Sequence, residues 1–562
     1  MESFLGEVAA DLYARYGEEL SQRAVLFPSR RARLFFTDAL ARIARRPMWQ
    51  PSWTTIDELM SEISGLRTGD RLRLITELYG IYSEYHAEPF DKFYFWGDML
   101  LADFDTIDKY RIDAAMLFRN IEEIREIEAD ISYLTPAQLR IVAFWSSLGA
   151  EADLSEEKRR FLAIWRTLGP VYRRFRERLS ELGIAYGGMV QRAAADRLRS
   201  GEFAFATPRR FVVAGFNALS ECEKELFRFL SSAAETDFYW DYDSYYKDDP
   251  EQEAGMFVRE NVVRFPPRAE LSHDGMSRPK ELTSVAAVSN AVQCKYVATI
   301  LRGLAAGGRL GKETAVVLTD ENLLLPLLCA MPPEVGPVNV TMGYPLRASL
   351  AYTFVERLVE LQARRRTKGA DCTFYHADVT GLLAHPYVAG CDAELTRRLQ
   401  EEIMRERRIS VEASWLGRND LLRLVFSPAA DWRALSAWLS EVVAAVVRIP
   451  CPDDDARRRT EFLAVIAGEI ARLGNSLDEC GIEPAPEVYA SLLRRHLQTL
   501  RIPYEGEPLE GLQVMGILET RNLDFRNVVL LSMNDDNFPG NRVAQASFIP
   551  YNLRAAFDLP TP

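Results

Sequence analysis

Short, almost continuous apolar runs recur along this chain in two groups, and a long helical stretch interrupts each group. The first group holds "AVLFP" at residues 24–28, "RFVVAGF" at 210–216 and "DFYWDYD" at 237–243. The second group holds "TSVAAVS" at 283–289, "TAVVLTD" at 314–320, "VNVTMGYP" at 338–345, "LQVMGIL" at 512–518 and "NVVLLSM" at 527–533. Apolar runs with little alternation are typical of strands buried on both faces, as in parallel sheets.

The order of these runs predicts an α/β fold with two parallel-sheet lobes, each interrupted by a large helical insertion. The first lobe is predicted over residues 1–65 and 206–280, with its insertion over 66–205. The second lobe is predicted over 281–352 and 509–562, with its insertion over 353–508 and its last part cut short. A chain of 562 residues is too long for one hydrophobic core, which favours this division.

Composition excludes several classes of function. The net charge of -13 argues against a protein that coats nucleic acid by bulk attraction, but it leaves room for a local basic groove. Seven cysteines without a CxxC pair, and histidines without metal-ligand spacing, predict reduced thiols in a cytoplasmic protein with no zinc site and no cofactor. The most apolar long run, "LSAWLSEVVAAVVRIP", contains Glu441 and is too short to span a bilayer, so no membrane partner is predicted.

The turn between the last two runs carries Glu519, Thr520, Arg521 and Asp524. A purely structural turn would more often consist of Gly, Asn, Asp or Pro. The turn follows a predicted parallel strand, and ligands of such sheets lie at the carboxyl ends of the strands. Two roles for Arg521 stay open, namely a contact to a phosphate or an internal clamp that pairs with one of the two acids.

The stretch "GILETRNLDFRNVVLLSMNDDNFPG" at 516–540 is similar to the motif V region of the AddB and RecB branch of superfamily 1 helicase-like proteins, and especially to AddB-like PD-(D/E)XK nuclease family proteins. "VLFPSRRARLFF" resembles motif Ia, "FVVAGFNALSECEKELFRFL" lies where motifs II and III are expected, and "VNVTMGYPL" resembles a block of the second lobe. The resemblance implies two RecA-like lobes of P-loop helicase type and a role in double-strand-break repair and recombination. It also implies DNA and an AddA-like helicase-nuclease subunit as partners.

The chain departs from the motor pattern where ATP chemistry would require specific residues. No glycine lies between Glu18 and Ser64, so the first strand leads into no phosphate-binding loop. "GGRLGKET" at 307–314 is out of register with a P-loop and precedes a predicted strand. No acid directly follows "RFVVAGFN". We therefore expect no ATP hydrolysis, although an active DNA-dependent ATPase or helicase remains an alternative.

Nuclease chemistry requires an acid and an E-x-K group on adjacent strands. The one tempting match, Glu156 with Lys158, lies in a predicted helical run. In AddB-like proteins the Mg²⁺-dependent nuclease follows the helicase-like part, so we expect this sequence to be a fragment of a longer exonuclease.

The resemblance to motif Ia implies DNA contacts for Ser29, Arg30, Arg31 and Arg33, which follow the first predicted strand. Arginines on the exposed face of an amphipathic helix are an equally good interpretation. Thr520 and Arg521 complete the predicted DNA-binding set. A helical protein-interaction scaffold without a DNA role is the third function considered.

Overall fold

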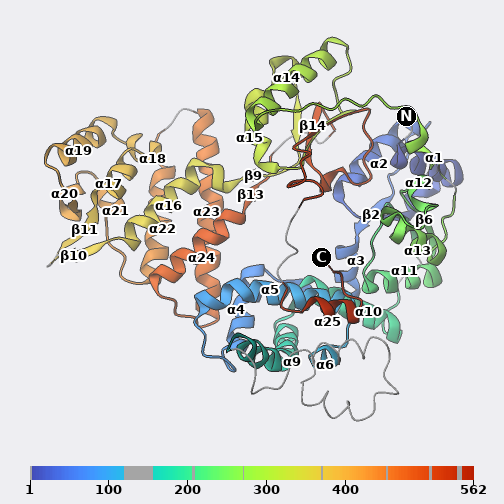
Figure 1. The fold of residues 1–562 in the computed structure, drawn as a ribbon, viewed down its shortest axis with the longest axis horizontal. Helices are drawn as coiled ribbons and strands as arrows, with labels where there is room; N and C mark the ends of the chain where they lie inside the picture. Colours follow the sequence, from blue (N-terminus) through green and yellow to red (C-terminus); the bar gives the residue numbers. More distant parts are fainter. Residues whose placement is uncertain are drawn as a thin grey trace. The chain divides into compact units, whose positions relative to one another are not determined.

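The computed structural model describes residues 3–118, 156–205, 209–269, 271, 273–368, 371–450, 453–504, 509–540 and 547–561. The chain divides into two compact units. The first comprises Met1–Leu74, Asp98–Met342 and Glu505–Pro562, and the second comprises Ile75–Gly97 and Gly343–Tyr504. Both predicted parallel sheets lie in the first unit (Figure 1).

The first sheet has the strand order β2-β1-β5-β6, and every pair is parallel. Its strands are β1 (Arg23–Phe27), β2 (Ser52–Thr55), β5 (Arg210–Ala214) and β6 (Glu235–Tyr239). Three of these strands coincide with the apolar runs of the sequence, which confirms a parallel sheet built from segments almost 200 residues apart. The strand β2 is less apolar and was not predicted.

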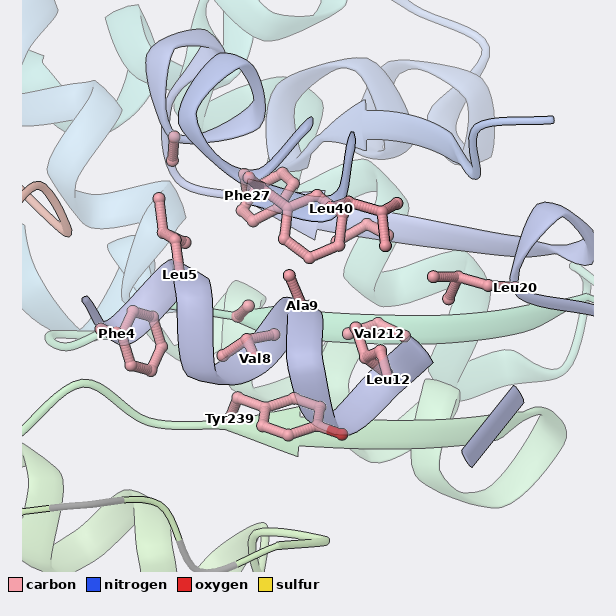
Figure 2. Packing of buried hydrophobic residues seen from close by; sticks show 14 residues of the cluster. Phe4, Leu5, Val8, Ala9, Leu12, Leu20, Phe27, Leu40, Val212 and Tyr239 are labelled. Atoms are coloured by element: carbon pink, nitrogen blue, oxygen red, sulfur yellow. The ribbon is translucent and has the colours of Figure 1, made fainter. Parts of the chain in front are cut away.

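One face of the first sheet is covered by helix α1 (Phe4–Tyr16). Figure 2 shows Val8, Ala9 and Leu12 of this helix lying over Val212 and Tyr239 of the sheet. These α1 side chains are fully buried, which agrees with the apolar spacing of the helix. The N-terminal helix is therefore part of the core that positions the strand ends.

The second sheet has the order β15-β7-β14-β8 and is also parallel throughout. Its strands are β7 (Thr314–Leu318), β8 (Val338–Val340), β14 (Leu512–Gly516) and β15 (Asn527–Leu531). Helices α14 (Asn290–Ala306) and α15 (Leu324–Ala330) contribute Val297, Leu301 and Leu327 to the core on one face. The predicted mixed α/β fold with parallel sheets is confirmed.

Two strand predictions for this lobe were wrong in part. The run "TSVAAVS" forms no strand, and each of residues 281–290 is exposed. The run "VNVTMGYP" splits, because β8 ends at Val340 while β9 (Tyr344–Pro345) belongs to the second unit and pairs with β13 (Arg501–Ile502). An apolar run reports the tendency to be buried, but it does not specify the partner.

The remaining helices of the first unit, as far as the structure describes them, are α2 (Arg30–Ile43), α3 (Ile56–Ser64), α6 (Ala114–Leu117), α9 (Glu156–Leu182), α10 (Gly187–Ser200), α11 (Glu221–Ala233), α12 (Ser244–Lys247), α13 (Met256–Arg264) and α25 (Tyr551–Ala556). Short strands β3 (Arg67–Thr68) and β4 (Ile184–Ala185) pair in parallel. Part of the predicted insertion over 66–205 lies outside the described residues. Capping boxes of Thr55 with Glu58 and of Ser220 with Glu223 begin α3 and α11.

The C-terminal part of the predicted second lobe makes a contact that the sequence did not indicate. The buried carboxylate of Asp103, in α5 (Phe90–Lys109), accepts hydrogen bonds from the Ser547 hydroxyl at 2.7 Å and the Phe548 amide at 2.6 Å. The ring of Phe548 stacks on Phe161 with centroids 5.3 Å apart. Residues 547–561 therefore pack on helices of the first predicted insertion.

The second unit is mainly helical, as predicted for residues 353–508. It contains α16 (Leu350–Ala363), α17 (His376–Leu383), α18 (Pro386–Ala389), α19 (Ala393–Arg405), α20 (Ala413–Leu416), α21 (Asp420–Val425), α22 (Trp432–Val447), α23 (Asp453–Glu479), α24 (Pro486–Thr499) and most of α4 (Arg71–Tyr82). The sequence did not indicate its antiparallel sheet of β10 (Arg366–Lys368), β11 (Asp371–Tyr375) and β12 (Ser410–Glu412). Strands of three to five residues give too little period-two signal to be recognised.

A buried arginine in the first sheet provides the first testable prediction. The Arg23 side chain is 2% exposed, stacks over the Tyr16 ring at 3.6 Å and lies 3.5 Å from the carboxylate of Asp237, which is 1% exposed. Arg23→Ala should lower the free energy of unfolding by about 3 kcal/mol, because it removes the buried guanidinium that pairs with Glu235 at 2.5 Å and with Asp237 at 3.5 Å. The Asp237 carboxylate then keeps the Tyr16 hydroxyl, at 2.6 Å, and the more distant Arg268. Chemical denaturation measures this loss.

Arg210→Ala is the matched control, because Arg210 pairs with Glu235 at 3.3 Å while its side chain is 43% exposed. This change should cost less than about 1 kcal/mol. Equal losses for the two variants would contradict the assignment of Arg23 as a buried partner.

Candidate nucleic-acid interface

The predicted functional turn is the β14–β15 loop, residues 517–526. It begins with a 3₁₀ turn over Leu518–Thr520, and the Thr520 hydroxyl donates a hydrogen bond to the Ile517 carbonyl at 2.7 Å. The hydrogen of the Thr520 hydroxyl is therefore engaged within the turn itself. Thr520 therefore closes the turn, and its predicted role in DNA binding gains no direct support from the geometry.

The loop reaches the carboxyl ends of the first sheet through Asn522. Gly215, directly after β5, has φ +79°, and a Cβ there would lie 2.6 Å from the Asn522 side chain. Asn522 itself has φ +60°, a left-handed conformation that asparagine adopts more readily than most residues. Its Nδ2 donates to the Asp241 carboxylate, just beyond β6, at 3.0 Å. Asn522 therefore fills the space above the ends of two neighbouring strands.

Three further contacts join the loop and its sheet to the first sheet. The Asp524 carboxylate accepts a hydrogen bond from the Phe4 amide at 2.9 Å, at the N-terminus of α1 where a negative charge is favourable. The Phe525 ring meets Phe35 of α2 edge to face with centroids 6.1 Å apart. Between the β7 end of the second sheet and α2, Lys312 pairs with Asp38 at 2.9 Å.

Arg31 at the start of α2 and the loop residue Glu519 interact electrostatically at the boundary between the two sheets, which is here called the seam. Burial lowers the pKa of the Arg31 guanidinium, and the Glu519 carboxylate opposes this shift. Nη1 of Arg31 and Oε2 of Glu519 are both buried without a hydrogen-bond partner among the described residues. The Glu519 carboxylate folds back over Gly516, where a Cβ would lie 2.5 Å from its Oε2. The acid of the turn thus lies against the strand end and compensates the charge of Arg31.

The other residues predicted after the first strand also have partners within the chain. The Ser29 hydroxyl caps α2 by accepting from the Ala32 amide at 3.2 Å. The Arg33 guanidinium lies 3.7 Å above the Trp53 ring. Arg30 is 80% exposed at its side chain and lies 3.5 Å from Glu58. Only Arg30 of this group retains an exposed cationic side chain, and the DNA contacts of all four remain predictions.

Arg521 differs from these residues because its side chain is exposed and forms no ion pair among the described residues. The clamp considered from the sequence is absent there, since Glu519 faces Arg31 and Asp524 bonds to Phe4. The exposed Arg30 and Arg521 lie next to Arg31 and near Glu519 in the sequence, each just after a strand end. Exposed arginines at adjoining strand ends can contact the phosphates of a strand laid along them.

The geometry offers little for nucleotide chemistry. β1 leads through Pro28 into the Ser29 cap, without the glycine loop that would wrap phosphates. "GGRLGKET" forms the turn between α14 and β7, and its Lys312 is engaged by Asp38. Among the residues that the structure describes, no group of three His, Cys, Asp or Glu side chains could hold a metal ion.

Sequence reasoning missed Gly215, Asp241 and Asn522 as parts of this site. Gly215 ends an apolar run, and Asn522 is a residue type that favours left-handed turns, so each carried a local signal. The contact between Gly215 and Asn522 joins positions 307 residues apart in the chain, and no local pattern indicates such a pairing.

No protein-family model matches the chain, and no curated protein matches it either. Within the described part of the chain, no helix has both the length and the apolar character needed to cross a bilayer.

The contact between Asn522 and Asp241 makes a prediction about pH. Asp241 is exposed as a residue, but its carboxylate lies against the β14–β15 loop. Desolvation by the surrounding protein raises the pKa of this carboxylate to about 6, Asp524 adds to the rise, and the Asn522 hydrogen bond opposes it. This pKa is above the usual value of about 3.9 in an unfolded chain. The group therefore contributes stability at low pH that is lost as the pH rises from about 4 to about 6.

Asp241→Asn should remove this dependence while keeping an oxygen that accepts from Asn522. We expect the variant to gain in thermal midpoint over the wild-type chain at about pH 7.5, and the gain to shrink by about pH 5. Asp248→Asn, at the exposed end of α12, serves as the control and should show no such change. A gain for Asp241→Asn that is equal at both pH values would contradict the raised pKa.

Proposed function

We propose that the chain is the helicase-like, non-hydrolysing portion of an AddB-type exonuclease subunit, and that it binds and guides unwound DNA during double-strand-break repair. One observation carries the proposal. The β14–β15 loop of the second sheet covers the carboxyl ends of β5 and β6 and brings Glu519 close to Arg31 after β1, at the edge of the sheet where a nucleotide would bind in a motor of this architecture. The same loop leaves Arg521 exposed.

Two RecA-like lobes are part of this proposal. Their support is the pair of four-stranded parallel sheets, each with its candidate residues at the carboxyl ends of the strands. A motor needs a glycine loop and a lysine to hold phosphates. The chain has neither after β1, and Lys312 is engaged in an ion pair that joins the two sheets.

The DNA-binding surface is proposed to consist of Arg30 and Arg521. Ser29 and Thr520 fix the backbone beside them through hydrogen bonds, and Arg31 and Arg33 interact with Glu519 and Trp53. Single-stranded DNA is the favoured ligand, because unpaired phosphates can follow an irregular seam between two sheets. An AddA-like motor subunit is the proposed partner in the cytoplasm. In this proposal the AddB-type subunit carries a Mg²⁺-dependent nuclease domain.

The absence of ATP chemistry is tested by calorimetric titration with Mg-ATP and by a hydrolysis assay with single-stranded DNA. We expect neither binding nor turnover, because the β14–β15 loop covers the ends of β5 and β6 and no glycine loop follows β1. Lys312→Ala should leave the assay unchanged and slightly lower the thermal midpoint, since it removes a half-exposed ion pair. DNA-stimulated turnover that Lys312→Ala abolishes would contradict the proposal and restore the ATPase interpretation.

The role of Arg521 is tested by measuring DNA affinity as a function of salt. Arg521→Ala should weaken binding equally for all single-stranded sequences and reduce the slope of log K against log[salt] by about 0.7, which corresponds to one phosphate contact. The thermal midpoint should stay unchanged, because the side chain has no ion pair among the described residues. Arg521→Lys keeps the charge and should retain the slope.

Two outcomes would contradict this assignment. A loss of stability with an unchanged salt slope would make Arg521 a structural residue. A wild-type chain that binds no DNA would instead favour a protein-interaction scaffold.

A further inference from the structure

Among the residues that the structure describes, β15 is an edge strand of the second sheet with no partner on its outer side. Its Asn527 amide donates to the Glu313 carbonyl at 3.2 Å, and its Leu531 carbonyl accepts from the Thr319 amide at 3.4 Å. Residues 527 and 531 therefore direct their backbone groups toward β7. Successive residues of a strand alternate in this respect, so Val528 and Leu530 direct their N–H and C=O groups away from the sheet.

The exposed side of this edge is apolar. Val528 is 50% exposed and Leu530 is 49% exposed, although Val529 between them packs into the core of the sheet. An edge strand that exposes both its backbone groups and apolar side chains is a ready template for another strand.

A second strand-like segment lies unpaired in the same unit. Residues 282–288, here called the strap, read "LTSVAAV" and are exposed along their whole length. Leu282 is 93% exposed and Val288 is 94% exposed. The strap is β-branched and apolar, a composition typical of strands buried in parallel sheets, and it contains no proline or glycine.

The end of the strap is held close to the end of β15. Ser289 caps α14, and Gln293 in the first turns of that helix accepts a hydrogen bond from the Ser532 amide at 2.5 Å. Ser532 directly follows β15. The strap therefore leads into its helix at the carboxyl end of β15, which is where a strand parallel to β15 would end.

The connection that follows fits the same arrangement. α14 leads to β7, which is the neighbour of β15 in the sheet. A strand beside β15, followed by α14 and then β7, would form a parallel strand–helix–strand unit that skips one strand, the ordinary way in which parallel sheets are built.

We propose that the strap, which lies unpaired in this structure, docks on β15 in solution as a fifth, parallel strand of the second sheet. Pairing would satisfy the outward backbone groups of Val528 and Leu530 and place strap side chains beside theirs on the face of the sheet. The strap is also the last part of the connection from the first sheet to the second. Its pairing would therefore shorten the unstructured part of that connection. This inference is independent of any role in DNA binding.

Hydrogen exchange of the full chain, followed by mass spectrometry, tests the proposal. We expect amides of the strap to exchange at least about tenfold more slowly than an unstructured peptide. Amides of 528–530 should slow with them. Strap amides that exchange at the unstructured rate would overturn the proposal.

Proline variants of the strap provide a matched pair. Ala286→Pro and Ala287→Pro remove adjacent amides, of which only one can point toward β15 because neighbouring residues alternate. One variant should abolish the protection of the strap, and the other should retain most of it. Both positions are exposed, so neither change threatens the rest of the fold.

Two results with these variants would count against the assignment. Retained protection in both prolines would mean that the strap is not hydrogen-bonded to the edge. Protection that appears only when the chain forms dimers would assign the edge to the strap of a second copy, and it would overturn intramolecular pairing.

Discussion

The side chain of Asn522 rests directly on Gly215, and the arrangement of the candidate site depends on that contact. Gly215 has no Cβ and a left-handed φ, and any side chain there would overlap Asn522. Asn522 in turn has a left-handed backbone and bonds to Asp241. Because these residues lie at the ends of β5 and β6, the loop of the second sheet covers the strand ends of the first.

The contact between Asn522 and Gly215 determines which charged side chains of the turn are available to bind a ligand. Glu519 is drawn over Gly516 toward Arg31, and Asp524 is drawn to the N-terminus of α1, so neither acid pairs with Arg521. The two acids of the turn therefore hold the loop against the first sheet and its helices. Arg521 is exposed and is the charged residue of the turn that a ligand can contact. The mixture of residue types in the turn follows from the seam between the two sheets.

The fold could be predicted to the extent that strands and helices carry periodic signals. β1, β5, β7, β14 and β15 coincide with apolar runs. The strand predicted for the strap is not formed in the structure, because an apolar pattern does not specify which strand it pairs with. The short strands of the second unit gave too weak a periodic signal to be predicted. At the site, the positions of Arg31 and Arg521 were predictable from strand ends. The contacts of the loop were not predictable, because Glu519 and Asn522 meet residues of the first sheet that are hundreds of positions away in the sequence.

The central claim is that the β14–β15 loop covers the ends of β5 and β6 and fixes the two sheets to each other without a nucleotide. Pulsed electron paramagnetic resonance measures this directly, with one spin label on a cysteine introduced at the exposed Ser232 of α11 and one on the exposed Cys329 of α15. The other accessible cysteines are replaced by serine. The account predicts one narrow distance distribution that saturating Mg-ATP leaves unchanged. A distribution that shifts when Mg-ATP is added would show a nucleotide-driven motion between the sheets and would contradict the account.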